Sequence, residues 1–355
     1  MPRLSGAAAC PSSVALATCG IHAQVMSTAD VQVWARSEPA EPGAVARALW
    51  EERSLVRTWC MRGTLHLLTP EQLALYSAVF DPAVNYTAVW LRNFQVTAED
   101  LDALYEAFSE ALEDGEPRTR RELAEVVTRR AGDHLGDRLR SSWGELLKPA
   151  ARRGLFVNGP NRGQETTYVR TESWLGPAPR IDPEAARLDW LRRYLRAYGP
   201  ASPQDYARWL GVRQMGPINA LVTRLGPELA EVRVAGQKLL ALSADLDELA
   251  GGERDAVAAV RLLPAFDTYV LGHADRDHLA GAEHRPLVYR TAGWISPTVL
   301  SGGRIVGVWE QRVEGASLAV RVTPFGTLSR AEQAGVRGEA ERLAAFFDRR
   351  PALYT

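Results

Sequence analysis

The pattern that decides the fold first occurs in Ser27-Thr-Ala-Asp-Val-Gln-Val-Trp-Ala-Arg36, where a hydroxyl side chain is followed three positions later by an acid. The spacing predicts a helix start, because such an oxygen can accept a hydrogen bond from the backbone of the first helical turn. The same pattern recurs at Thr119-x-x-Glu122 and Ser202-x-x-Asp205. The copies lie roughly eighty to ninety residues apart, which exceeds solenoid periods and fits one small domain for each copy.

Each copy continues with the same order of predicted elements. Short helical patterns follow the caps at Val31 to Arg36, Leu123 to Arg130 and Tyr206 to Leu210. Second helices are predicted at Val45 to Arg53, Trp143 to Arg152 and Ile218 to Leu225. Alternating or β-branched runs then predict strand pairs at Val56 to Leu68, Leu155 to Val169 and Leu229 to Leu242. This is the order of a helix-turn-helix with a wing, although an α/β protein with recurring caps would show it too.

Further helices are predicted ahead of the second and third copies, at Ala98 to Leu112 and Pro183 to Tyr198. Linkers are expected at Glu113 to Pro117 and Gly176 to Pro183, where glycine, proline and charge gather. We therefore place the boundaries of three successive units at residues 1–96, 97–176 and 177–250.

The remaining residues, 251–355, have a strand-like pattern from about residue 253. The run Val299 to Trp309 predicts a hairpin with a Gly302-Gly303 turn, and Leu318 to Val322 predicts another strand. A last amphipathic pattern at Ala331 to Phe347 predicts a helix that packs on this β-rich unit. The expected fold is α+β, with three helix-turn-helix units followed by a β-rich one.

The composition limits the classes of function. The chain has 355 residues, 46% of them hydrophobic, and a formal net charge of −1. A near-neutral charge excludes a generally basic nucleic-acid binder, so any DNA footprint must be local. We expect a cytoplasmic protein, because the N-terminus makes a poor signal peptide and no run of about 18 apolar residues occurs. An odd set of cysteines, Cys10, Cys19 and Cys60, predicts neither a disulfide framework nor a structural zinc site.

The motif His22-Ala23-Gln24 carries the strongest indication of chemistry. Histidine has an unperturbed pKa of about 6.5, so His22 can hold and deprotonate a water near neutral pH while the Gln24 carboxamide orients that water. Taken alone, an imidazole and a carboxamide two residues apart are equally typical of a helix start or a core histidine. The decision between these interpretations depends on other motifs of the chain.

Two further stretches supply those motifs, Arg57-Thr-Trp-Cys-Met-Arg-Gly-Thr-Leu-His66 and Leu262-Leu-Pro-Ala-Phe-Asp-Thr-Tyr-Val-Leu-Gly-His-Ala-Asp-Arg276. With them the chain resembles the winged-helix DNA glycosylases of the AlkZ and YcaQ type, which remove alkylated bases from DNA. The resemblance spans residues 20 to 310. The family's catalytic pair is Gln-Φ-Gln or Gln-Φ-Asp, where Φ is aliphatic. The His-Φ-Gln of this chain departs from it, and resembles variants associated with bulky guanine adducts of DNA-reactive antibiotics.

The resemblance implies three tandem winged-helix units plus a C-terminal β-rich unit, C-shaped around double-stranded DNA. It implies hydrolytic excision of an N7-alkylguanine, with His22 and Gln24 as the catalytic residues and with no cofactor. Glycosylases that also cut the backbone typically use an amine nucleophile. Lys148 and Lys238 are the only lysines, and we expect both to lie away from the motif. A monofunctional enzyme that acts as a monomer in DNA repair and antibiotic self-resistance is therefore expected.

Other residues are candidates for binding substrate or DNA. Met26 either lines the adduct pocket or simply packs. Arg62 and His66 flank Gly63, and they either contact a phosphate or adduct or form the solvated face of a wing. Arg276 and Arg304 are candidate DNA contacts, and the hairpin tip at Arg304 is small enough to enter a minor groove. Base stacking by Trp34, Trp50 and Trp59 is possible, but core packing is the commoner role of tryptophans at helical spacing.

Two rival functions remain open at this point. The cluster His273-Ala-Asp-Arg-Asp-His278, with His284 beyond, superficially suggests a metal-dependent hydrolase. We expect no metal there, because the acids lie close to Arg285 and favour ion pairs. A non-catalytic winged-helix regulator is the other rival, but it would need a basic recognition helix, and Val45 to Arg53 contains Glu51 and Glu52 instead.

Overall fold

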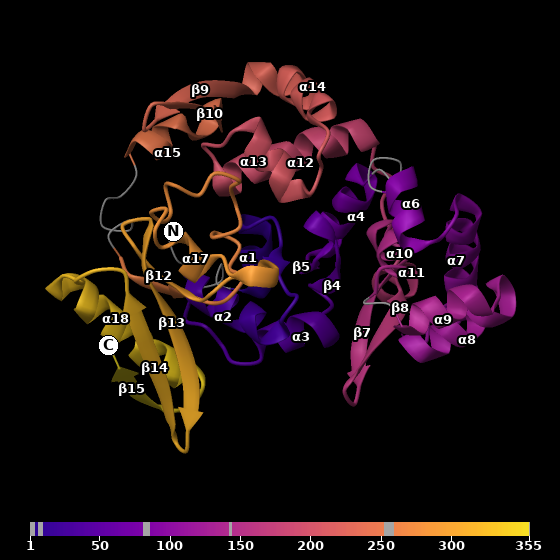
Figure 1. The fold of residues 1–355 in the computed structure, drawn as a ribbon, viewed down its shortest axis with the longest axis horizontal. Helices are drawn as coiled ribbons and strands as arrows, with labels where there is room; N and C mark the ends of the chain where they lie inside the picture. Colours follow the sequence, from indigo (N-terminus) through magenta and orange to yellow (C-terminus); the bar gives the residue numbers. More distant parts are fainter. Residues whose placement is uncertain (1–3, 6–9, 81–85, 142–143, 252–258, 355) are drawn as a thin grey trace.

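The computed structural model describes residues 4–5, 10–80, 86–141, 144–251 and 259–354, and is drawn in Figure 1. Three successive segments repeat one order of elements: a leading helix, a short strand, further helices, and a hairpin whose second strand pairs with the short strand. A β-rich segment follows them. The model is 49% helix and 22% strand, which confirms the mixed α and β class predicted from the sequence.

The first segment contains the candidate motif between its first two helices. Its elements are α1 (Pro11–Ala17), β2 (Ile21–His22), α2 (Met26–Arg36), α3 (Ala44–Trp50), β4 (Val56–Trp59), β5 (Leu65–Leu68), α4 (Pro70–Val79) and α6 (Ala88–Phe94). The short strands β1 (Leu4–Ser5) and β3 (Ser37–Glu38) pair in parallel. The sheet order is β2-β5-β4, so β5 lies between the motif strand and β4.

The second segment repeats this order. Its elements are α7 (Ala98–Ala111), β6 (Arg118–Thr119), α8 (Arg120–Ala131), α9 (Asp133–Ser141), α10 (Lys148–Arg152), β7 (Phe156–Arg162), β8 (Glu165–Arg170) and α11 (Thr171–Leu175). The sheet order is β6-β8-β7. The helix expected to begin at Trp143, which lies outside the described residues, is present only as the short α10, and α9 was not predicted.

The third segment and the C-terminal segment complete the chain. The third contains α12 (Pro183–Tyr198), α13 (Pro203–Leu210), α14 (Met215–Leu225), β9 (Leu229–Val234), β10 (Gln237–Leu242) and α15 (Leu246–Gly251). Ala201 bridges Leu240 of β10 and so takes the place of the short strand. The C-terminal sheet has the order β11-β12-β13-β14-β15. Its elements are β11 (Arg261–Leu263), α17 (Arg285–Val288), β12 (Thr298–Ser301), β13 (Arg304–Glu314), β14 (Ser317–Pro324), α18 (Arg330–Phe346) and β15 (Arg350–Tyr354).

Two of the predicted helix caps are confirmed and one is wrong. The hydroxyls of Thr119 and Ser202 accept hydrogen bonds from the backbone of the residues three positions later, at 3.3 and 3.1 Å. Ser27 does not cap a helix, because α2 already begins at Met26, after Val25. The backbone N–H of Ala23 donates to Leu65 at 2.8 Å, so strand pairing continues almost to the helix and Ser27 falls inside the first turn.

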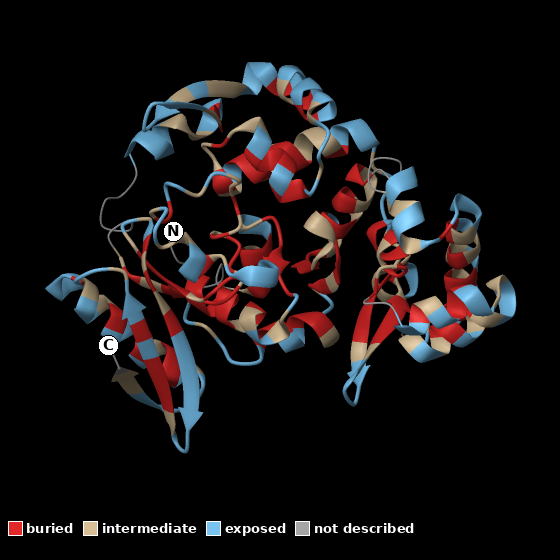
Figure 2. Cartoon of the chain, viewed as in Figure 1, coloured by how far each residue is buried: buried red, intermediate tan, exposed pale blue. Residues whose placement is uncertain are grey.

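The first segment packs against its neighbours through shared apolar clusters. Val31 and Trp34 of α2 pack with the C-terminal sheet, whereas Ala29 and Val33 pack inside the first segment. A helix with apolar residues around most of its circumference is stable only when both sides are covered. Figure 2 shows exposed residues on the outer side of α14 and on the projecting half of β13. The site motif is therefore held in the most enclosed part of the chain.

Candidate active site

Strand pairing brings two histidines together. In the antiparallel pair of β2 and β5, His22 lies directly opposite His66. Directly opposite residues of such a pair place their side chains on the same face of the sheet. The two imidazole rings meet edge to face, with centroids 5.1 Å apart and planes 76° apart. The candidate catalytic residue and one candidate substrate contact thus form one cluster, although 44 positions separate them in the sequence.

The imidazole of His22 is enclosed by aromatic groups. It is only 3% exposed, and Phe266 stacks on its other side with ring centroids 5.2 Å apart and planes 13° apart. The backbone carbonyl of His22 accepts a hydrogen bond of 2.7 Å from Gln32 of α2. Nδ1 of His22 is buried, and the described residues offer it no hydrogen-bond partner. A buried ring nitrogen of this kind needs a partner, which bound water or substrate can supply.

Burial keeps His22 neutral. Desolvation lowers the pKa of His22 to about 3, and the nearby positive charge of Arg62 acts in the same direction. The expected pKa near 6.5 is therefore wrong, because the sequence does not show that the ring is buried between Phe266 and His66. A neutral imidazole can accept a hydrogen bond from water at neutral pH, but it is a weak base. Its chemical role is therefore to hold and polarise water rather than to remove a proton completely.

His66 is also neutral, and its tautomer follows from its neighbours. Its side chain is 1% exposed, and burial lowers its pKa well below the usual value, with His22 and Arg62 adding to the effect. Nδ1 lies 3.0 Å from the carbonyl oxygen of Thr64, which can only accept, so Nδ1 carries the proton. Nε2 therefore accepts from the Arg62 guanidinium at 3.4 Å.

Arg62 connects this cluster to the third segment. Its Nη1 donates to the backbone carbonyl of Trp209 at 2.7 Å. Its backbone has the left-handed φ of 56°, in the turn between β4 and β5. A Cβ on Gly211 would lie 2.8 Å from the Cα of Arg62, so only glycine permits this approach of the two segments. Arg62 and His66 are thus engaged inside the protein, and a contact to phosphate requires Arg62 to leave Trp209.

Gln24 presents one half of its amide outward. The residue is exposed, and its Oε1 accepts a hydrogen bond of 3.2 Å from the backbone N–H of Leu65. Because an N–H donor requires the oxygen at that position, Nε2 is turned toward solvent. Between the two catalytic candidates, the carbonyl of Ala23 accepts from Nε and Nη2 of Arg57 at 3.2 and 3.0 Å. The motif backbone is therefore fixed from two sides while the Gln24 amide group stays available.

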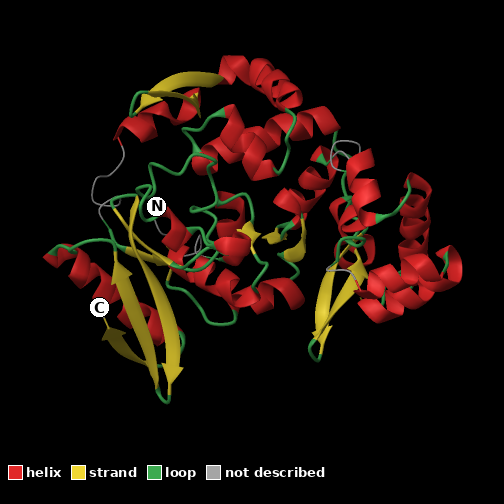
Figure 3. Ribbon diagram, viewed as in Figure 1, coloured by secondary structure: helices red, strands yellow, loops and turns green. Residues whose placement is uncertain are grey.

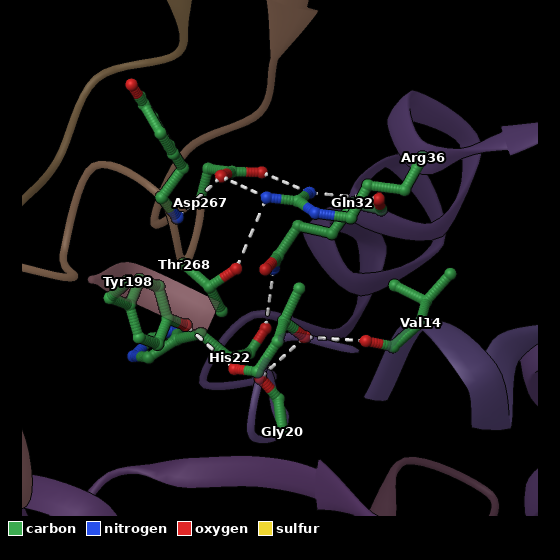
Figure 4. Close-up of polar contacts among 10 residues, drawn as sticks. Val14, Gly20, His22, Gln32, Arg36, Tyr198, Asp267 and Thr268 are labelled. Carbon is green, nitrogen blue, oxygen red and sulfur yellow. Dashed lines mark hydrogen bonds and ion pairs between the residues drawn. The ribbon is translucent and has the colours of Figure 1, made fainter. Parts of the chain in front are cut away.

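A buried ion pair joins the motif to the C-terminal segment (Figure 4). Nη1 and Nη2 of Arg36 donate to the Asp267 carboxylate at 2.8 and 2.7 Å, and these residues are 5% and 0% exposed. Asp267 follows Phe266, whose left-handed φ of 60° places the ring on His22. Gln32, one helical turn before Arg36, holds the His22 backbone. The sequence motifs alone assigned no role in the site to any of these four residues.

The other predicted contacts lie in different surroundings. Met26 is half-buried and packs against the apolar cluster of the first segment. Arg276 is half-buried, stacks over Tyr289 at 3.9 Å, and has a pKa lowered mainly by burial. Arg304 is exposed at the β12–β13 turn, and no described residue forms an ion pair with it. The neighbouring Gly303 carbonyl accepts from the Tyr269 hydroxyl at 3.1 Å, which fixes the turn.

Lys148 lies nearer to the motif than expected. A Cβ on Gly63 would lie 3.9 Å from Cδ of Lys148, so this side chain packs on the turn before β5. The expectation that both lysines lie away from the motif is wrong for Lys148, because α10 of the second segment packs against β4. Its ammonium is paired with Glu145 at 2.5 Å, and that of Lys238 with Glu231 at 2.9 Å.

The alternative sites have structural explanations. Asp277 forms the expected ion pair with Arg285, and within the described ranges no group of three or more histidine, cysteine or acidic residues could hold a metal. Trp34 and Trp59 are core residues, 0% and 6% exposed, as their spacing predicted. The cysteines are free thiols, and two of them are buried. Over the part of the chain that the structure describes, no helix has the length and apolar character needed to cross a bilayer.

The fold and the His22-Gln24 site are those of enzymes that act on N-glycosyl bonds in DNA. A family model described as DNA glycosylase AlkZ-like matches residues 15–346. This chain therefore belongs to the AlkZ-like DNA glycosylase family, as its motifs indicated. Family membership decides against the non-catalytic regulator and the metal-dependent hydrolase.

Two relatives from Streptomyces sahachiroi are similar over most of their length. One is an interstrand DNA cross-link repair glycosylase, 37% identical over 336 residues that cover 92% of this chain and 88% of the relative. The other is the solved structure of the DNA glycosylase AlkZ, which superposes with a TM-score of 0.87 at 36% identity. That superposition covers 97% of this chain and 92% of the relative.

Proposed function

We propose that this enzyme is a monofunctional DNA glycosylase that hydrolyses the N-glycosidic bond of N7-alkylguanine in double-stranded DNA and leaves an abasic site. The arrangement of His22 and Gln24 is the observation that carries this proposal. The ring nitrogen of His22 that lacks a partner accepts a hydrogen bond from water, and the outward amide of Gln24 orients that water. The water then attacks C1′ as the base leaves.

A weak catalytic base suits this substrate. Guanine alkylated at N7 is already cationic, so the base needs little protonation as it leaves. A protonated histidine beside a cationic base would repel it, whereas the lowered pKa of His22 keeps the imidazole neutral throughout the physiological pH range. The developing positive charge on the sugar likewise meets a neutral ring. The environment that makes His22 a poor base therefore makes it compatible with a cationic substrate.

The same reasoning assigns positioning roles to His66 and Arg62. His66 donates to Thr64 and accepts from Arg62, and it packs its ring against His22. We propose that His66 orients the catalytic ring, and that Arg62 contacts the adduct or a phosphate only after leaving the Trp209 carbonyl. Met26 lines the edge of the adduct site. An amine mechanism is not part of the proposal, since Lys148 and Lys238 are both held in ion pairs.

We propose that the three repeated segments are winged-helix units, at residues 1–96, 97–176 and 177–250, and that residues 251–355 form the β-rich unit. The β7–β8 and β13–β14 hairpins project on the same side at opposite ends of the molecule (Figure 3), which fits a C-shaped clamp around duplex DNA. Arg304 and Arg276 would contact the DNA. The β12–β13 turn enters the minor groove.

The substrate is proposed to be a bulky adduct of a DNA-reactive natural product, excised in antibiotic self-resistance. The relative named for interstrand cross-link repair supports a large lesion, and we extend cross-link repair to this chain. A bulky intercalated adduct is difficult to flip into a pocket, so the base would be cleaved while still stacked. We further propose that the enzyme works as a monomer in the cytoplasm.

Incubation of the purified enzyme with a set of modified duplexes tests this function. The duplexes carry 7-methylguanine, a bulky N7-alkylguanine, or an N7-linked interstrand cross-link, and alkali then cleaves any abasic site. We expect strand cleavage at the modified guanine only after alkali treatment. Absence of cleavage on every duplex would contradict the N7-alkylguanine specificity. Cleavage of the 7-methylguanine duplex alone would contradict the bulky-adduct proposal but not the glycosylase function.

A further inference from the structure

A second site lies where the first three segments meet. A cavity of about 350 Å³ is lined by residues of α4, α10, α12, α13 and α14. Its walls are mainly apolar, and Phe80, Leu210 and Ile218 are among the residues that form them. Cavities of about 300 Å³ and more are typical of small-molecule sites. None of the catalytic residues proposed above lines this cavity.

The phenol of Tyr206 has no partner in this cavity. Tyr206 is 1% exposed, and no residue in the described ranges forms a hydrogen bond with its hydroxyl group. Buried tyrosine hydroxyls usually have a partner, because leaving a polar group unsatisfied costs about 1–3 kcal/mol. Burial also raises the pKa of Tyr206, so the phenol stays protonated and can donate. A bound acceptor in the cavity would satisfy this group.

The charged residues of the lining favour a negative ligand. Arg152 is 8% exposed; its Nε donates to the hydroxyl of Tyr76 at 2.9 Å, and its guanidinium stacks over Phe80 at 4.3 Å. Neither Arg152 nor Arg187 forms an ion pair with any residue that the structure describes. Glu184, the acid of the lining, is already paired with Arg224. A buried guanidinium without a carboxylate is expensive, and an anion would compensate it.

We propose that this cavity binds a small organic anion with a flat apolar body. The apolar wall takes the body of the ligand. Arg152 and Arg187 pair with its carboxylate or sulfonate, and the Tyr206 hydroxyl donates to the same group. Because the first three segments all line the cavity, bound ligand also stabilises their junction. This is a binding site separate from the His22-Gln24 pair, and it does not depend on which lesion the enzyme excises.

The probe for the test is 8-anilinonaphthalene-1-sulfonate, a flat apolar anion whose fluorescence rises on binding, with N-phenyl-1-naphthylamine as its uncharged counterpart. We expect saturable one-to-one binding of the anion and clearly weaker binding of the amine. Charged hydrogen bonds contribute about 1.5–3 kcal/mol, so Arg152→Gln should weaken anion binding about 10-fold to 100-fold. Tyr206→Phe should weaken it about 10-fold and leave thermal stability unchanged or higher, because it removes an unsatisfied hydroxyl.

A pair of tryptophan variants keeps the test valid if Arg152→Gln does not fold. Ala220 and Asn219 are both exposed on α14, but only Ala220 lines the cavity. Ala220→Trp should block binding of the anion, whereas Asn219→Trp should bind as the wild type does. The proposal is overturned by equal binding to wild type and Ala220→Trp, by equal affinity for the charged and uncharged probes, or by the absence of saturable binding.

Discussion

Replacing Arg36 with methionine tests how the C-terminal segment supports the catalytic histidine. The substitution leaves the fully buried Asp267 carboxylate without its two charged donors. Removing one partner of a buried ion pair typically costs about 3–5 kcal/mol. At about 2–4 °C per kcal/mol for domains of 150–250 residues, the melting temperature should fall on the order of 10 °C. An exposed pair provides the control: Arg47→Met, which removes the partner of Glu41, should cost less than about 1 kcal/mol.

The double variant Arg36→Met/Asp267→Leu separates stability from catalysis. Replacing both partners with apolar residues removes the unpaired charge, so most of the stability should return. Excision should stay slow, because Asp267 no longer accepts from Tyr269 at 2.9 Å and the loop that places Phe266 on His22 is no longer held. Scanning fluorimetry and single-turnover excision at a temperature where all variants are folded measure the two effects. Wild-type excision by the double variant would refute the positioning role of the ion pair.

Three further predictions follow from the site. Because the pKa of His22 is lowered to about 3, its contribution to stability is complete above pH 6.5 and declines as the pH falls toward 3; between pH 6.5 and 5 the wild type should lose about 2 kcal/mol more than His22→Gln in urea unfolding. Borohydride should trap no covalent complex with DNA; a trapped complex that disappears in Lys148→Ala or Lys238→Ala would establish an amine mechanism. Neutralising Arg276 or Arg304 should lower the slope of log affinity against log salt by about 0.9 for each phosphate that the protein no longer neutralises, and unchanged slopes would place the DNA footprint elsewhere.

Much of the secondary structure could be predicted from local signals. The helix predicted at Pro183 to Tyr198 has the same limits as α12, since proline at its start and glycine after its end mark both of them. The hairpin turn at Gly302-Gly303 is confirmed as well. The helix α9 was missed because glycine interrupts its pattern. A Cβ on Gly136 would collide with the Thr128 hydroxyl oxygen, so this glycine serves close packing of α8 and α9 rather than a turn.

The site could be predicted only in part. The His22-Gln24 motif is local and could be recognised, but the partners that set its chemistry are distant in the sequence. Asp267 lies 231 residues from Arg36, and the register that opposes His66 to His22 depends on strand pairing. The lowered pKa of His22 results from burial by these distant groups. A three-residue motif can therefore indicate the reaction, whereas the strength of its base follows only from the tertiary structure.

The most direct test of the account is single-turnover excision of a bulky N7-alkylguanine by His22→Ala and Gln24→Ala. We expect each variant to excise about 100-fold to 10,000-fold more slowly than the wild type, in keeping with the removal of a water-positioning group. Both should fold and bind duplex DNA nearly as well as the wild type. Wild-type excision rates in both variants would contradict the account, because water at the His22-Gln24 pair would then play no part in cleaving the bond.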